Sequence, residues 1–168
     1  MLALFETLFD IIRLRKGPDA IPHSTVLLAI VVGLWLFAGL VVTITTPELD
    51  QAGFLFGTIA GVAGLGCYTA IILLFGRSAR LMQAVIAIFG CGAVLSLMSA
   101  AADVFLKPFL SANLTNIAVA LIILWSVPVE GHIISRTIER HWYLGVVIAM
   151  SVFILQLVLY RQINPAAT

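Results

Sequence analysis

Glu130 is the residue whose surroundings most suggest chemistry. It lies in the segment S-V-P-V-E-G-H, residues 126–132, within a long apolar run. A carboxylate inside a membrane costs about 1–3 kcal/mol unless it is paired or protonated, so this side chain should face other helices. One interpretation is a proton- or cation-handling carboxylate with His132 as a relay. The other is an ion pair with Arg77 or Arg80, which lie at the same level on a neighbouring turn and would pin two helices together.

We favour the ion pair because few other polar groups lie at mid-depth. A transport path usually needs several, and the sequence offers mainly Ser96, Ser126 and Ser151. Serine hydroxyls in helices can bond to their own backbone and need no substrate. Gln156 is expected to bond across to another helix. Pro128 removes a backbone donor and should bend the helix that carries Glu130.

Other reactive side chains form no recognisable site. The three histidines, His23, His132 and His141, are too dispersed for a metal motif. Cys67 and Cys91 both lie inside apolar runs, as buried thiols do. There is no nucleophile motif, no glycine-rich phosphate loop and no histidine pair suited to haem. We therefore expect no enzyme, no cofactor and no metal.

The composition indicates whether this chain is surrounded by water or by lipid. Of its 168 residues, 62% are hydrophobic and only 10% are charged, and the mean hydropathy is +1.15. Soluble domains are about 45–50% apolar and about 25% charged, so a water-facing surface cannot be built from this sequence. The net charge of +1 gives no electrostatic footprint for nucleic acid. The lipid bilayer must surround most of the molecule.

Apolar runs divide the chain into five membrane spans after a short first helix. A 19-residue run such as 26–44 covers roughly 28 Å as a helix, close to the hydrocarbon thickness of about 30 Å. We predict an all-α polytopic protein with a single membrane domain, residues 1–168. Its expected parts are an interfacial amphipathic helix at 1–17 and spans at 26–44, 47–75, 80–106, 114–135 and 142–160.

Local signals mark the ends of these segments. Glu6, Asp10 and Arg13 share one helical face in a stretch that is otherwise apolar, which predicts a helix lying in the membrane interface until Gly17-Pro18. An alternative is an ordinary helix packed on the bundle. Ser24 or Thr25 should cap the first span, Thr46-Pro47-Glu48 should open the second, and Gly76 should end it.

The basic residues predict the orientation. With a cytoplasmic N-terminus, seven of the nine lysines and arginines fall in inside segments and two fall outside. Such a bias in short loops places the C-terminus outside. The seven are Arg13, Arg15, Lys16, Arg77, Arg80, Arg136 and Arg140, and the two are Lys107 and Arg161.

A stripe of glycines runs along the second span. Gly53, Gly57, Gly61 and Gly64 fall on one helical face. Membrane helices associate by close backbone approach across small residues, so this face should dock on another. The expected partner is the small-residue face of span 80–106, which includes Gly92 and Ser96. The stripe would serve either internal packing or an interface with a partner or a second copy. If these faces instead lay apart or lined a wet cavity, a transporter would be the better interpretation.

The order of these features resembles the Yip family of integral membrane proteins. The matching features are five spans after a short amphipathic helix, a glycine-rich second span, a small-residue third span after G-R-S-A-R, and a fourth ending L-W-S-V-P-V-E-G-H-I-I-S-R. The resemblance implies a scaffold or adaptor. The eukaryotic members act in vesicle traffic through Rab-type GTPases and carry a longer N-terminal region with an acidic, tyrosine-containing motif. That motif does not occur here, so the chain looks more like the bacterial branch, in the cytoplasmic (inner) membrane.

These observations favour a non-enzymatic scaffold, assembly factor or accessory subunit that acts through helix contacts. Its partners would be the bilayer and a membrane protein or further copies of itself. The alternative is a small oligomeric transporter or channel that uses Glu130. An intramembrane enzyme is the least favoured class, because the chain offers no nucleophile, metal constellation or soluble domain.

Overall fold

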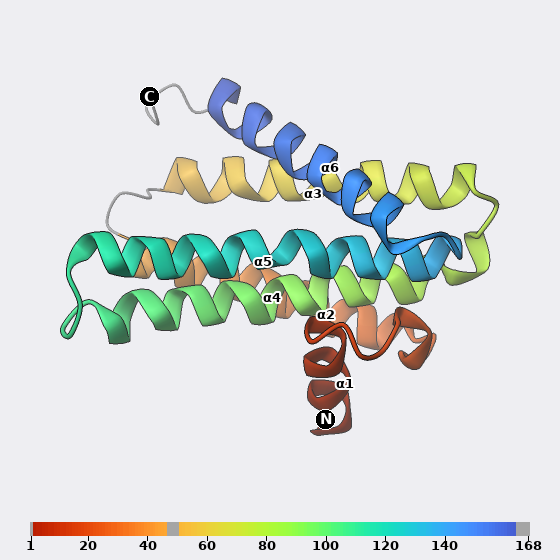
Figure 1. Ribbon diagram of the computed structural model, residues 1–168, viewed down its shortest axis with the longest axis horizontal. Helices are drawn as coiled ribbons and strands as arrows, with labels where there is room; N and C mark the ends of the chain where they lie inside the picture. Colours follow the sequence, from red (N-terminus) through yellow and green to blue (C-terminus); the bar gives the residue numbers. More distant parts are fainter. Residues whose placement is uncertain (1, 47–50, 164–168) are drawn as a thin grey trace.

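The computed structural model describes residues 2–46 and 51–163, and this part of the chain is helical (Figure 1). A short first helix precedes five helices that are long and apolar enough to cross a membrane, which confirms the predicted fold class. The helices are α1 (Leu2–Ile12), α2 (Thr25–Thr45), α3 (Gln51–Leu74), α4 (Leu81–Leu106), α5 (Ala112–Ile138) and α6 (Trp142–Ile163), with 3-10 turns η1 (Pro18–Ala20) and η2 (Ser78–Arg80).

Most helix ends lie close to their predicted places. Ser24 caps α2, and its Oγ accepts a hydrogen bond from the Leu27 amide at 3.2 Å. Gly76 ends α3 in the left-handed region with φ +70°, a conformation that suits glycine. The predicted start of the second span at Pro47 lies outside the described residues. Helix α5 continues three residues past the predicted Ser135 and ends at Ile138, and α6 likewise continues three residues past the predicted Tyr160.

The long helices run roughly along one direction, with α6 set obliquely (Figure 1), and α4 is the most buried of the five. The principal neighbours of α4 are α2 and α5, while α6 packs on α5 and crosses α3 obliquely. Ala84, Ile86 and Ala87 of α4 have no exposed surface. The other spanning helices keep much more of their surface on the outside of the bundle, as helices do when lipid is their solvent.

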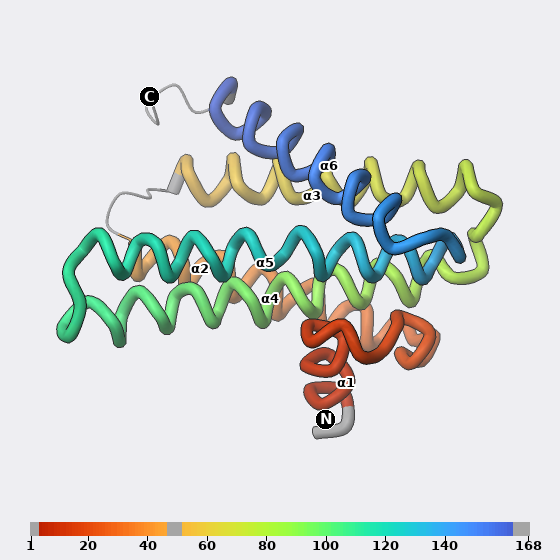
Figure 2. The backbone as a smooth tube through the Cα atoms, viewed as in Figure 1, coloured from red at the N-terminus to blue at the C-terminus, as the bar shows by residue number. Residues whose placement is uncertain are grey.

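Helix α1 lies across the bundle rather than along it (Figure 2). Leu8 packs against Gly90 of α4, and the indole N–H of Trp125 donates a hydrogen bond to the Ile12 carbonyl at 3.1 Å. Part of the apolar face of α1 is therefore covered by protein, whereas Phe5 and Phe9 stay exposed. The transverse direction fits a helix in the membrane interface that also packs on the bundle.

The first helix is shorter than predicted, because it ends at Ile12 and not at Gly17-Pro18. Leu14 adopts the left-handed conformation with φ 61°, and the Arg15 amide donates to the Asp10 carbonyl at 2.8 Å. This pattern is a Schellman ending with leucine in the position that glycine usually takes. The sequence did not predict this end of α1, because the left-handed position is taken by Leu14 and not by a glycine.

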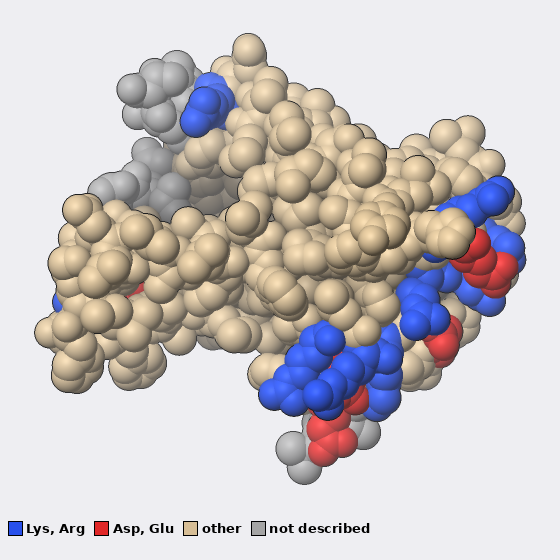
Figure 3. Space-filling model, in the orientation of Figure 1, with Lys and Arg blue, Asp and Glu red and all other residues tan. Residues whose placement is uncertain are grey.

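Charged side chains gather at one end of the bundle and on α1 (Figure 3). That end is formed by the α3–α4 and α5–α6 turns, and we call it the basic end. It carries four of the arginines, and Lys107 and Arg161 lie toward the opposite end. The four are Arg77, Arg80, Arg136 and Arg140.

Candidate functional site

The two small-residue faces do not pack against each other, because a tryptophan stands between them. The benzo edge of Trp35, on α2, lies where Gly61 has no side chain; a Cβ there would be 2.7 Å from Trp35 Cζ2. The pyrrole edge lies near Gly92, where a Cβ would be 3.6 Å from Cδ1. The indole also makes an edge contact with Phe89 at 5.1 Å between ring centroids. The predicted docking of these two faces is therefore wrong, because the indole of Trp35 lies between Gly61 and Gly92.

The remaining glycines of the stripe have different neighbours. At Gly64 the side chain of Gln156, from α6, occupies the space that a Cβ would need, and its Nε2 donates to the Ala60 carbonyl at 3.3 Å. This confirms the predicted bond from Gln156 to another helix. A Cβ at Gly57 would meet no atom within 4 Å. The face predicted for helix docking is thus only partly used for it.

The open part of the glycine face lines a cavity of about 500 Å³. All five long helices contribute to its wall, including Gly53, Gly57 and Gly61 of α3 and Ser96 of α4. Its lining reaches Tyr160 near the end of α6, so the cavity occupies the half of the bundle opposite the basic end. The cavity forms where the glycines of α3 carry no side chain and where the indole of Trp35 lies between α3 and α4.

The cavity wall is apolar and contains no charged side chain among the described residues. Its aromatic surface comes from Trp35, Phe54, Phe153 and Tyr160. A few polar groups are present, among them the amide of Gln156. Ligand pockets in proteins have this character, with an apolar wall and a small number of polar groups that orient the ligand. The wall suits an uncharged molecule with an apolar body, and it does not suit a bare ion.

Glu130 lies on the basic side of this cavity and is paired with a tyrosine. The Oη of Tyr68, on α3, donates to Glu130 Oε2 at 2.5 Å. Tyr68 is seven residues beyond Gly61, and Glu130 is seven beyond Ile123, so both continue helix faces that line the cavity. The hydrogen bond closes the gap between α3 and α5 just beyond the cavity.

The predicted ion pair between Glu130 and the arginines is wrong, because both arginines pair with Glu139 instead. Arg77 contacts Glu139 Oε2, and Arg80 Nη2 lies 2.8 Å from Glu139 Oε1. Glu139 ends α5 in the left-handed conformation with φ 54°. Because α5 extends to Ile138, Glu130 is about 13 Å deeper along the helix than Glu139, beyond the reach of that turn.

His132 does not lie beside Glu130 either. Two positions along a helix are about 200° apart, and His132 faces the segment after α1, where its Nε2 lies 3.1 Å from the Lys16 carbonyl. A relay between Glu130 and His132 therefore lacks the necessary contact. Within the described residues no three histidine, cysteine or acidic side chains are grouped to hold a metal ion.

A close backbone contact between α5 and α6 involves two glycines that the sequence did not single out. Gly131 of α5 and Gly145 of α6 are both buried. A Cβ on Gly131 would lie 2.8 Å from the backbone of Val146, and a Cβ on Gly145 would strike the Gly131 carbonyl. Each glycine is isolated in its own helix, so no repeated spacing marks it. Two single glycines on different helices can be recognised as a contact only when it is known that these helices are neighbours, and the sequence alone does not show this.

Comparison with protein-family models, with curated proteins and with solved structures finds no match to this chain. What the molecule itself establishes is a five-span helical membrane protein in contact with the lipid bilayer.

Proposed function

We propose that this protein binds a small uncharged molecule with an apolar body inside the membrane and carries it between the two leaflets or sides. The observation behind this proposal is the cavity of about 500 Å³ lined by the glycine face of α3. A face whose only role was helix docking would be filled by its partner, whereas a Cβ at Gly57 would meet nothing within 4 Å.

The contacts between the apolar cavity and the basic end support transport of the bound molecule and not only its binding. The cavity lies toward one end of the bundle, and the hydrogen bond from Tyr68 to Glu130 lies between it and the basic end. Arg77 and Arg80 join the α3–α4 turn to Glu139 still further along. Opening a path to the basic end would require α3 to move away from α5 and these polar contacts to break.

A pair of glycine substitutions tests the proposal. Gly57 is exposed in the wall of the cavity, and Gly57→Leu should narrow that cavity without a clash. Gly66→Leu places the same side chain at another exposed position of the same helix, which does not line the cavity and also has nothing within 4 Å. We expect native mass spectrometry of protein from mild detergent to show a bound small molecule in the wild type and in Gly66→Leu, and not in Gly57→Leu. The same molecule, added to proteoliposomes, should cross faster with the wild type than with Gly57→Leu.

Two results would contradict the proposal. One is the same bound mass, or none, in all three proteins. The other is a Gly57→Cys variant, in a background without Cys67 and Cys91, that membrane-permeant thiol reagents fail to label, since the cavity would then be inaccessible.

A scaffold or accessory subunit remains a second candidate, and one observation favours it. Gly33 of α2 and Gly66 of α3 are exposed, and a Cβ on either would meet nothing within 4 Å. Small residues on outer faces permit another membrane helix, from a partner or a second copy, to approach closely. Loss of a co-purifying protein or of self-association in Gly33→Leu, with the bound small molecule retained, would favour this candidate.

The finer identity and location are also proposals. The order of spans and the segment around Glu130 resemble the bacterial branch of the Yip family, which would make this a protein of the cytoplasmic membrane. The gathering of arginines at the basic end, together with Arg13, Arg15 and Lys16 on and after α1, supports a cytoplasmic basic end. Protease or thiol-labelling accessibility from each side of the membrane would test this orientation.

A further inference from the structure

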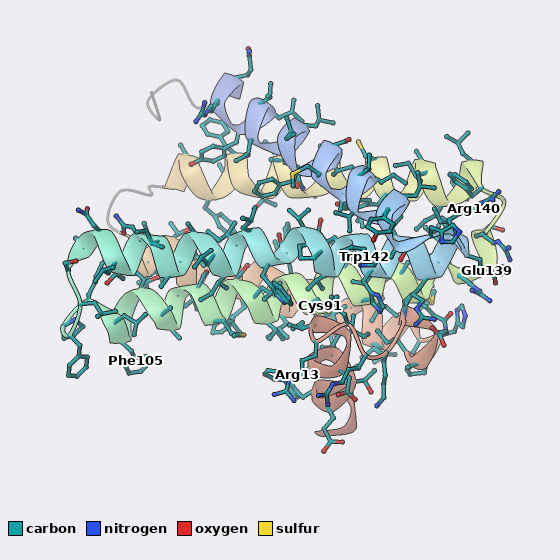
Figure 4. All side chains as sticks on the ribbon, in the orientation of Figure 1. Arg13, Cys91, Phe105, Glu139, Arg140 and Trp142 are labelled. Atoms are coloured by element: carbon teal, nitrogen blue, oxygen red, sulfur yellow. The ribbon has the colours of Figure 1, made fainter. Side chains whose placement is uncertain are left out.

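A second cavity, of about 610 Å³, lies at the basic end, and its wall is charged where that of the first cavity is apolar. Its wall is formed by η1, by η2, by the last turns of α5 and by the α5–α6 turn with the start of α6. Three guanidinium groups line it, from Arg80, Arg136 and Arg140, together with the imidazoles of His132 and His141. Figure 4 shows Arg140 beside Glu139 and Trp142 at this end of the molecule.

Two of these arginines have no acidic partner among the described residues. Glu139 is shared by Arg77 and Arg80, so its charge is already used. Arg136 and Arg140 form no ion pair within the described part of the chain; the Arg140 guanidinium lies over the Phe75 ring at 5.9 Å. The other carboxylate in the wall is Asp19. The cavity therefore keeps an excess of positive charge and of unused donors.

The position of the cavity matches the depth of lipid head groups. Trp142 and Tyr143, at the start of α6, are exposed, and aromatic rings of this kind favour the membrane interface. The first turn of α6 also brings unpaired amides and the positive end of the helix dipole to the cavity. Basic pockets between helix ends at this level suit anionic head groups, and arginine binds phosphate oxygens in pairs.

We propose that this cavity binds a phosphate group, presented either by an anionic phospholipid or by a soluble phosphate compound. The principal donors are Arg136 and Arg140, and Asp19 opposes binding. The inference does not depend on what occupies the apolar cavity, since the two lie at different ends of the bundle and share no lining residue.

The test compares two double variants that remove the same charge. Arg136→Gln with Arg140→Gln acts inside the cavity, while Arg13→Gln with Arg15→Gln acts on exposed arginines of the α1 region that do not line it. In the lipid arm, the proteins are placed in nanodiscs of phosphatidylcholine with phosphatidylglycerol, and retained lipid is measured by native mass spectrometry. In the soluble arm, inorganic phosphate is compared with chloride at matched ionic strength by thermal unfolding.

We expect anion binding to fall about fivefold for each cavity arginine removed, and to change much less in the α1 variant. Preferential retention of phosphatidylglycerol identifies a lipid source, and a stabilising shift by inorganic phosphate identifies a soluble one. Asp19→Asn should tighten binding, which checks the site with a variant that removes no donor. Equal loss in both double variants, or no preference for either anion in the wild type, would overturn the proposal.

Discussion

The hydroxyl of Tyr68 on α3 and the carboxylate of Glu130 on α5 form a 2.5 Å hydrogen bond across 62 residues of sequence. Helices α3 and α5 have little other contact, so this bond is the main polar connection between them. It also lies on the basic side of the apolar cavity. Its removal should therefore affect both the stability of the bundle and the separation of the cavity from the basic end.

Tyr68→Phe should lower the free energy of unfolding by about 1–3 kcal/mol, because Glu130 would lose its partner in a low-dielectric site. Denaturant unfolding in detergent measures this. Tyr143→Phe is the matched control, since Tyr143 is 75% exposed at the basic end, and it should leave the unfolding midpoint unchanged. Equal midpoints for Tyr68→Phe and the wild type would show that the hydrogen bond contributes nothing.

Glu130→Gln separates the structural role of this carboxyl from a role in proton handling. The amide oxygen still accepts from Tyr68, so we expect at most a modest loss of stability. If transport is coupled to protons through Glu130, flux driven by a pH gradient should disappear while binding in the cavity persists. Unchanged gradient-driven flux would restrict Glu130 to the structural role.

Gly131→Ala should destabilise the α5–α6 contact by about 1–3 kcal/mol, because the added methyl group meets the backbone of Val146 at 2.8 Å and backbone cannot move cheaply. Gly66→Ala adds the same methyl group to a helix position with nothing within 4 Å. Thermal unfolding of the two variants in the same detergent gives the comparison. A larger loss in Gly66→Ala than in Gly131→Ala would contradict this account of the packing.

Hydrophobic length alone located the five spans, because a lipid-facing helix needs a continuous apolar run whatever its neighbours are. The pairing of helices was not predictable in the same way. Lipid tails and apolar side chains are equivalent as surroundings, so a small-residue face does not specify its partner. Trp35 shows the difficulty: one indole in α2 fills the place where α3 was expected to meet α4.

The candidate sites were predictable in part. Glu130 was recognised from its apolar surroundings, but its partner was not, since nothing in the local sequence connects Tyr68 to it. Arg77 and Arg80 were expected to pair with an acid on α5, yet the acid is Glu139. That error arose because Arg136 to Ile138 continues the helix, although its polar residues suggested a turn.

Glu139→Gln should cost little at physiological salt. The ion-pair side chains are 40–43% exposed, and pairs of that kind contribute about 0.2–1 kcal/mol in low salt and less when screened. We expect the difference in unfolding free energy from the wild type to shrink as salt is added. Glu6→Gln is the control, since Glu6 is an exposed acid without an ion pair in the described chain. A salt-independent loss would mean that Glu139 acts through its backbone conformation instead.

The end of α1 should respond to acid. A hydrogen bond from Lys16, at 2.7 Å, lowers the pKa of Asp10 below its ordinary value of 3.8. A carboxylate whose pKa is lower in the folded state than in the unfolded state stabilises the fold at pH values above its pKa in the unfolded state. This stabilisation is lost as the pH falls through its pKa in the folded state. Hydrogen-exchange protection of α1 should thus decline below about pH 4. Asp10→Asn should remove that decline, and an identical profile in this variant would refute the assignment.

Helix α1 precedes in the chain the helices on which it packs, so it is synthesised before them. The Leu8 carbonyl accepts a hydrogen bond from the thiol of Cys91, which lies 83 residues later in the chain. The Ile12 carbonyl accepts one from the indole of Trp125, which lies 113 residues later. As the chain leaves the ribosome, α1 must wait at the membrane surface with Leu8 and Ile11 uncovered until α4 and α5 have been inserted. The docked N-terminal helix is therefore a marker of completed insertion, and a nascent chain truncated before α5 would leave it free for chaperones and proteases.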